Sequence, residues 1–302
     1  MKRWLKRIAL GLLALIALVL VSGGIYAYAQ TSAYDASVAK VYDVAPLPLA
    51  RTSDPAAITR GKHLTESIVG CALNDCHGPD LGGGKVTDGG PIGTMVAPNM
   101  TNILPAYNDG ELARLIRHGI KKDGRTVRFM SVNEFNWITD ADVVAVLSYV
   151  RTVPAVERTT PPMNIKTLGK VLDRRGQIPI DVARRIDHAR IETGPPPSPT
   201  ADYGRYIARL CIGCHGDHLS GGPIPGAPSD FPVPLNLTPH ETGLKGWTLE
   251  DLEKVATTGV NKKGKRLDAF MPVEAIAHMD DVEKRALWAY LQSLPPAPFG
   301  GR

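Results

Sequence analysis

The chain has 302 residues, a formal charge of +5 and an isoelectric point near 9.0. Much of the excess charge lies in four basic residues within the first seven, so the charge does not indicate binding to nucleic acid. The length suffices for two domains of ordinary size. Glycine and proline are frequent, at 30 and 25 residues, and 6% of residues are aromatic, so we expect helices joined by long loops rather than large sheets.

The N-terminal segment carries a targeting signal. Basic residues up to Arg7 precede an apolar run from Ile8 to about Ala29, which contains no charged residue and is long enough to span a membrane. Because the basic residues precede the run, we expect the N-terminus in the cytoplasm and the rest of the chain exported. A cleaved signal peptide is the alternative, since Ala27 and Ala29 have the spacing of a cleavage site. The length of the run favours an anchor in a bacterial cytoplasmic (inner) membrane, with the folded part on the periplasmic side.

Four cysteines occur in two tight pairs, and a histidine follows the second cysteine of each pair. The segments read C-A-L-N-D-C-H at residues 71–77 and C-I-G-C-H at residues 211–215. Exported proteins normally use cysteines in disulfides, but the adjacent histidines in both pairs argue against that use here.

The second half of the chain repeats the first at a nearly constant shift over about eighty residues, which indicates a duplication. The matching pairs include His77 and His215, Gly83 and Gly221, Asn99 and Asn236, Gly119 and Gly259, Met130 and Met271, Tyr149 and Tyr290, and Pro154 and Pro295. We therefore predict an anchor or signal segment at 1–32, a linker at 33–50, one domain at 51–155, a connector at 156–198 and a second domain at 199–302.

Each copy is expected to be helical, with no competing strand pattern. A helix leads into the cysteine pair, a short helix follows at 111–119 or 249–259, and an amphipathic helix ends the copy. Asp109 and Thr248 are the expected N-caps of the middle helices, and residues 104–110 and 222–238 are expected as loops.

The last helix of the first copy has a capping pair, Thr139 and Asp142, before an apolar face. In the connector, the arginines are read as a solvated face, with a docking surface as the alternative. These arginines are Arg174, Arg175, Arg184 and Arg185.

Two thiols and an adjacent imidazole can hold a haem covalently. The thiols add to the two vinyl groups, the histidine ligates the iron, and C-x-x-C-H is the attachment signature of haem c. Cys211, Cys214 and His215 fit it unaltered, whereas four residues separate the cysteines of the first site, which we read as a variant. The alternatives are a structural zinc bound by four thiolates, or two local disulfides. Recurrence of Cys-His in both copies of an exported chain favours two haems c, with His77 as the other proximal ligand.

A low-spin electron carrier needs a sixth iron ligand, and a methionine thioether opposite histidine raises the reduction potential. Met130 and Met271 occupy equivalent positions in the two copies, and each follows a phenylalanine. A lone methionine usually fills a core, but the coincidence in both copies makes these two the predicted ligands. The substitutes are Met95, Met100, Met279, His63, His118, His218 and His278.

With these residues in view, the sequence resembles the class I c-type cytochromes, and among them the multi-haem cytochrome c subunits of periplasmic membrane-bound alcohol, aldehyde and sugar-acid dehydrogenases. The similarity covers nearly everything after residue 50. The motifs that carry it are C-I-G-C-H-G at 211–216, L-S-G-G at 219–222, L-N-L-T-P at 235–239, T-G and G-W at 242–247, and F-M-P at 270–272.

The resemblance implies an all-α protein: two tandem helical haem domains with His/Met ligation. It also implies a relay of electrons from a dehydrogenase towards a quinone-linked complex or a terminal oxidase, so the chain is expected to be an electron carrier and not itself an enzyme. Such subunits often carry three haems, whereas this chain has two sites, and Ser131 stands where a proline would follow the ligand methionine. The alternative is a dihaem redox enzyme with an open haem site, peroxidase-like or thiosulfate-oxidising.

Overall fold

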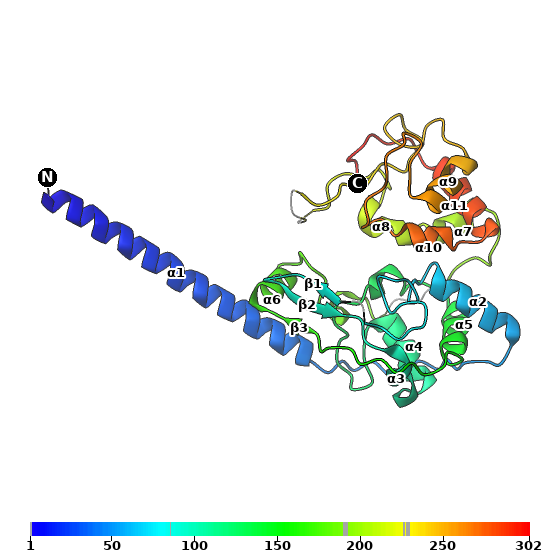
Figure 1. Cartoon of the computed structure of the whole chain (residues 1–302), viewed down its shortest axis with the longest axis horizontal. Coiled ribbons are helices and arrows are strands. Elements are labelled where there is room, and N and C mark those ends of the chain that lie inside the picture. The colour runs from blue at the N-terminus through cyan, green and yellow to red at the C-terminus, as the bar shows by residue number, and fades with distance from the viewer. Residues whose placement is uncertain (1, 85, 190–192, 226, 228–229) are drawn as a thin grey trace.

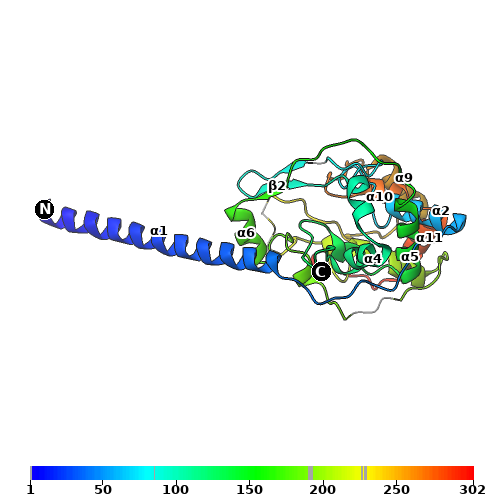
Figure 2. The ribbon, with the colours of Figure 1, turned by 90° about the horizontal axis from the view of Figure 1, so that it is seen from below.

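The computed structural model describes residues 2–84, 86–189, 193–225, 227 and 230–302. The fold is mostly helical, as predicted. A long N-terminal helix, α1 (Lys2–Ala39), projects from the folded part of the chain, and the second half of the chain lies against the first (Figure 1). A view at right angles shows α1 leaving the folded part at one end (Figure 2). The segment Arg3–Ala39 of this helix is long enough and apolar enough to cross a membrane.

The first half is built from helices around a buried core. Its helical elements are α2 (Pro55–Glu66), α3 (Met100–Ile103), η1 (Leu104–Ala106), α4 (Asp109–His118), η2 (Val132–Glu134) and α5 (Asp140–Val150). Thr139 caps α5 by accepting a hydrogen bond from the Asp142 amide, as predicted. The apolar face of α5 that begins at Val143 is buried, which confirms its role in the core.

The second half repeats much of this order. Its helices are α7 (Ala201–Ile207), α8 (Arg209–His215), α9 (Leu249–Thr258), α10 (Val273–Ala277) and α11 (Asp281–Ser293). Thr248 caps α9 in a capping box with Asp251, and α9 ends at Gly259 in the left-handed conformation, as α4 does at Gly119. Asp109 was wrongly predicted as the cap of α4: Asn108 caps it, in a capping box with Glu111, and the expected loop at 104–110 contains η1.

In each half, two helices cross at a glycine. A Cβ atom on Gly61 of α2 would lie 1.9 Å from the Ala145 carbonyl oxygen of α5, and one on Gly204 of α7 would lie 1.9 Å from the Ala286 carbonyl oxygen of α11. Only glycine permits this approach, so the crossing ties the helix before each cysteine pair to the last helix of its copy.

We expect Gly204→Ala to destabilise the protein by about 3 kcal/mol, because the added methyl group would force the two helix backbones apart. The measurement is denaturant unfolding of the purified protein. Gly264→Ala is the control: nothing lies within 4 Å of its Cβ position, and its φ of 76° costs about 1 kcal/mol for a non-glycine residue. An equal loss of stability in the two variants would contradict the close helix crossing.

The described residues also form a small antiparallel sheet that the sequence did not predict. Its strands are β1 (Val86–Asp88), β2 (Gly93–Val96) and β3 (Asn164–Ile165), in that order. Thr87 pairs with Met95, and Gly93 pairs with Ile165. Strand β3 comes from the range expected as a connector, so this range adds a strand to the first half.

The described part of the connector contains helical elements that pack onto the first half. It contains α6 (Thr167–Arg174) and η3 (Ala183–Arg185), and α6 packs against the end of α1. Arg184 and Arg185 both pair with Asp173, whose side chain is fully buried. The predicted solvated arginine face is therefore wrong for Arg184, which is half-buried, whereas Arg185 is exposed and also pairs with the buried carboxylate.

Helix α1 continues past the predicted end of the anchor at residue 32. Tyr34 is buried at 1% exposure in a cluster with Met95, Ile165 and Ile180. The Ser37 hydroxyl donates a hydrogen bond to the Asp181 carboxylate. The first part of the expected linker is thus helical and packed onto the folded part.

Candidate functional site

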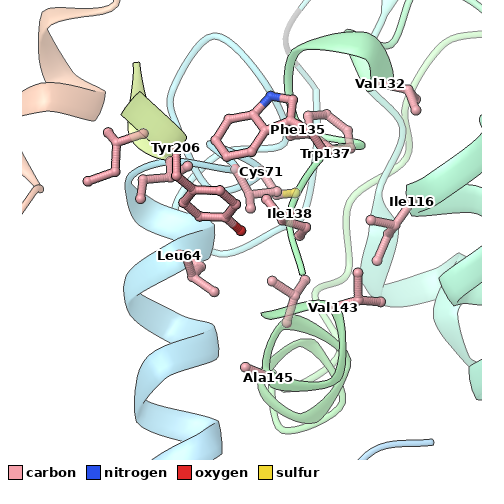
Figure 3. Packing of buried hydrophobic residues seen from close by; sticks show 14 of the residues in the cluster. Leu64, Cys71, Ile116, Val132, Phe135, Trp137, Ile138, Val143, Ala145 and Tyr206 are labelled. Atoms are coloured by element: carbon pink, nitrogen blue, oxygen red, sulfur yellow. The ribbon is translucent and has the colours of Figure 1, made fainter. Parts of the chain in front are cut away.

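The two cysteine segments differ in secondary structure but agree in which cysteine is less exposed. Residues 71–77 form consecutive turns, whereas residues 211–215 end α8. In each pair the first cysteine is less exposed: Cys71 is buried and Cys76 exposed, and Cys211 is half-buried and Cys214 exposed. Burial raises the pKa of the Cys71 and Cys211 thiols to about 12. Cys71 belongs to the buried cluster that also contains Ile138 and Trp137 (Figure 3).

The two histidines have the same hydrogen bond. His77 Nδ1 lies 2.8 Å from the Pro98 carbonyl oxygen, and His215 Nδ1 lies 2.6 Å from the Leu235 carbonyl oxygen. A carbonyl only accepts, so Nδ1 carries the proton and Nε2 presents its lone pair. Burial lowers the pKa of both imidazoles, which keeps them neutral. Each histidine is thereby oriented and in the tautomer that a metal ligand requires.

A matching pair of polar residues supports each accepting carbonyl. Asn99 and Asn236 follow the accepting residues directly, and their carboxamide oxygens accept hydrogen bonds from the hydroxyls of Thr101 and Thr238. The Asn99 amide donates to the Val156 carbonyl oxygen. The Asn236 amide donates to the Ala297 carbonyl oxygen in the same way. In each half, these hydrogen bonds join two segments: the loop that orients the histidine, and the segment that follows the last helix.

The two predicted methionine ligands also lie in matching surroundings. Met130 and Met271 are half-buried and pack against the core cluster that contains Cys71. The amides of Val132 and Val273 donate to the carbonyl oxygens of Met130 and Met271 at 2.8 and 2.7 Å. The described contacts place both methionines on this core but define no ligand bond between a methionine and a histidine.

The donor set fits covalent haem at both sites. Each site offers two free thiols, an imidazole with Nε2 available and a thioether on the same core. None of the four thiols forms a disulfide, and among the described residues no three of them lie close enough together to share one metal ion. A four-thiolate zinc site needs all four sulfurs around one ion, which this arrangement does not provide.

The segment that follows each methionine contacts the cysteine segment of the opposite half. A Cβ atom on Gly213 would lie 2.7 Å from both carboxylate oxygens of Glu134, so η2 of the first half presses on the second cysteine segment. Reciprocally, the Asn74 amide of the first cysteine segment donates to Glu274 of α10 at 2.9 Å. Both cysteine segments therefore line one interface between the halves.

A buried ionic network holds the same two halves together. Arg60 of α2 lies 3.2 Å from Asp142 and 2.9 Å from Glu283, whose side chain is fully buried. His63 Nε2 lies 2.7 Å from Glu283, and the Tyr206 hydroxyl donates to Asp142. His63, Asp280 and Glu283 also form a group of possible metal donors, but Arg60 already neutralises Glu283, so we interpret the group as an ion-pair network.

The His63–Glu283 contact predicts a pH window for stability. The hydrogen bond to Glu283 raises the pKa of His63 above 6.5, so its contribution is complete below pH 6.5 and is lost as the pH rises through the raised pKa. Burial would raise the pKa of Glu283, but His63 and Arg60 outweigh burial and lower it, so its contribution is complete above pH 4.5 and is lost as the pH falls through the lowered pKa. The network contributes fully between these limits.

We expect His63→Gln to lower the free energy of unfolding by about 1.5–3 kcal/mol at pH 5.5, the usual contribution of a hydrogen bond to a charged group. The difference from the parent protein should be smaller at pH 8.5, because the contribution is lost as the pH rises through the raised pKa of His63. Denaturant unfolding at both pH values measures it. A difference that does not change with pH would contradict a protonated His63 in the interface.

Three of the substitute ligands have other partners or other surroundings, whereas Met100 and Met279 belong to the same core cluster as Met130 and Met271. His63 pairs with Glu283, and His118 Nδ1 lies 3.3 Å from His188 Nδ1. Met95 is buried in the small cluster around Tyr34.

The sequence analysis did not identify Glu134 and Glu274 as residues of the site. The repeat contained the signal, because these two glutamates match at a shift of 140 residues, as Gly119 and Gly259 do.

Comparison with curated proteins identifies relatives over most of the chain. The cytochrome subunit of fructose dehydrogenase from Gluconobacter japonicus is 24% identical over 273 residues, which are 82% of this chain and 54% of the relative. The predicted resemblance is confirmed: the chain is related to cytochrome c subunits of dehydrogenases. The cytochrome c subunit of the quinone alcohol dehydrogenase from Gluconobacter oxydans is 35% identical over 94 residues, 29% of this chain and 20% of the relative.

Another relative, the gluconate 2-dehydrogenase cytochrome c subunit of Pantoea cypripedii, is 33% identical over 94 residues, 29% of this chain and 21% of the relative. No family model matches the chain. The chain thus spans about half the length of the fructose dehydrogenase subunit, and a smaller share of the other two.

Proposed function

We propose that the chain is a dihaem cytochrome c that transfers electrons in a dehydrogenase-linked chain at the bacterial cytoplasmic membrane. The observation that carries the proposal is the repeated histidine geometry: His77 and His215 each bond a backbone carbonyl through Nδ1, next to two thiols. Haem c, when bound, supplies one-electron iron chemistry. Cys71, Cys76 and His77 would hold one haem, and Cys211, Cys214 and His215 the other.

The two halves are, in this proposal, tandem cytochrome c domains, with Met130 and Met271 as sixth ligands. The matched helix crossings, capping boxes and polar loops support the duplication. The reciprocal contacts of Glu134 and Glu274 place both attachment segments at one interface, an arrangement that suits a short relay. Helix α1 would anchor the protein, with the haem domains on the periplasmic side.

The named relatives suggest a dehydrogenase as electron donor, because each is a cytochrome subunit of a dehydrogenase. A quinone-linked complex or a terminal oxidase would be the acceptor. Copurification after mild detergent extraction tests the partner, and a lone monomer would count against a fixed subunit of a complex.

A potentiometric titration followed by absorption spectroscopy tests the function itself. We expect two reversible one-electron steps in the full chain. No reversible step would contradict electron transfer as the function, and one step would limit the relay to a single domain.

A further inference from the structure

Helix α1 carries its own marker of where a membrane would end. Tyr26 and Tyr28 are 47% and 75% exposed near the end of the apolar run, and tyrosines are enriched at the boundary between lipid and water. Tyr34 follows Tyr28 by six residues, a rise of about 9 Å along a helix, and is already buried in the folded part. The folded part must therefore begin within about one headgroup layer of the bilayer.

Helix α6 is the element next to that boundary. It packs against the end of α1, and Lys170 pairs with Asp35 of α1 at 2.7 Å. Both views place α6 at the end of the folded part from which α1 projects (Figures 1 and 2). Because α1 runs without interruption from its apolar segment to this contact, the orientation of α6 is tied to that of the anchor.

The two faces of α6 differ in an unusual way. Gly169 and Asp173, one helical turn apart, are buried against the fold. At 100° per residue the opposite face presents Thr167, Leu168, Val171, Arg174 and Arg175, whereas Leu172 lies nearer the buried face. Leu168 is 43% exposed and Arg175 is exposed, while Val171 and Leu172 are half-buried. The outward face of α6 is thus a short apolar strip, Leu168 and Val171, bordered by basic residues.

The charges around this face fit a lipid surface. Lys166 and Arg175 are exposed at the two ends of α6, and Arg174 is half-buried beside them. The acidic residue of the helix, Asp173, is buried and already paired with Arg184 and Arg185, so it does not offset them at the surface. An apolar helical face flanked by basic residues is typical of a helix that lies in the headgroup region of an anionic bilayer.

We propose that the outward face of α6 lies in the headgroup layer of the outer leaflet, beside α1, and binds anionic lipid. The inference rests on the proposed membrane anchor and extends it: the chain attaches through two elements. Helix α6 would then limit the tilt of α1, and with it that of the folded part above the bilayer.

Spin labels on the full dihaem chain in phosphatidylcholine–phosphatidylglycerol nanodiscs test the proposal. The native cysteines are bound to haem, so one introduced cysteine carries the label. Leu168→Cys is the test site. Lys254→Cys, an exposed position on α9 in the second half, is the water control, and Ile25→Cys in α1 is the lipid control. Collision rates with oxygen and with a water-soluble nickel complex are measured at each position.

We expect the label at position 168 to show a several-fold lower nickel collision rate than at position 254, together with a higher oxygen rate. Burial in protein would lower both rates, so the ratio separates lipid from protein. If the collision rates at position 25 indicate lipid but those at position 168 equal those at position 254, the proposed contact of α6 with lipid is wrong and the proposed membrane anchor is supported. If position 25 also reports water, the anchor itself is wrong. Loss of the effect in phosphatidylcholine alone would support anionic lipid, whereas an unchanged effect would contradict it.

Discussion

Replacing Cys211 and Cys214 together by alanine is expected to reduce the covalently bound haem from two per chain to one. The second site has the unaltered attachment spacing, and no other described thiol pair can take over its role, since Cys71 and Cys76 lie in the other half. Pyridine haemochrome absorbance against protein mass measures the count, after expression with the cytochrome maturation machinery.

The matching pair of replacements, at Cys71 and Cys76, tests the longer spacing of the first site. We expect it also to remove one haem, because His77 has the same Nδ1 bond to a carbonyl as His215. That bond orients the imidazole independently of the number of residues between the thiols. Asn74→Ala, which changes the same segment without touching a thiol, is the control and should retain both haems.

The parent protein decides between the remaining interpretations. One haem per chain would leave the first half without its proposed cofactor, and the duplication would then be structural only. No haem at all, in cells that mature other cytochromes, would contradict the proposal for both halves and return the cysteines to zinc or disulfide chemistry.

The parts of the fold that the sequence predicted correctly are those determined locally. Thr139 and Thr248 cap the helices that follow them, and Gly119 and Gly259 end theirs, because capping depends on residues within one turn. The one-residue error at Asn108 has the same origin: Asn108 and Asp109 are both good caps, and the capping box with Glu111 decides between them.

The parts that the sequence did not predict depend on contacts between distant segments. Strand β1 is three exposed residues and gains its pairing only from β2. Asp173 looks like a surface residue until Arg184 and Arg185 fold back onto it. The contact of Glu134 with Gly213 joins residues on opposite halves, and the carbonyls of Pro98 and Leu235 are backbone groups with no side-chain signal.

Replacement of the methionine ligands is the second change with a large expected effect. Met271→Ala should remove the thioether that stabilises ferrous iron and lower the reduction potential of one haem by a sizeable part of the range of about 0.8 V that axial ligands span. The other haem should keep its potential. A spectroelectrochemical titration resolves the two steps and shows which one moves.

Met130→Ala should lower the reduction potential of the other haem. The surroundings of the two methionines also differ, and this difference can be tested. The Phe129 amide, directly before Met130, donates to the Ile180 carbonyl oxygen of the connector at 2.9 Å. The Phe270 amide bonds only locally, to the Asp268 carboxylate, and its ring is 67% exposed. The connector therefore restrains the first ligand segment, so we expect added cyanide to displace the methionine slowly at both haems of the parent protein, and sooner at the second haem than at the first.

Met279→Leu tests the substitute ligand that is buried in the same core, and a leucine preserves its volume. It should leave both potentials unchanged. If Met271→Ala leaves both potentials unchanged as well, the thioether is not the sixth ligand of the second haem. Rapid cyanide binding by the oxidised parent protein at both haems would go further: it would mean exchangeable iron positions and would favour a dihaem enzyme over an electron carrier.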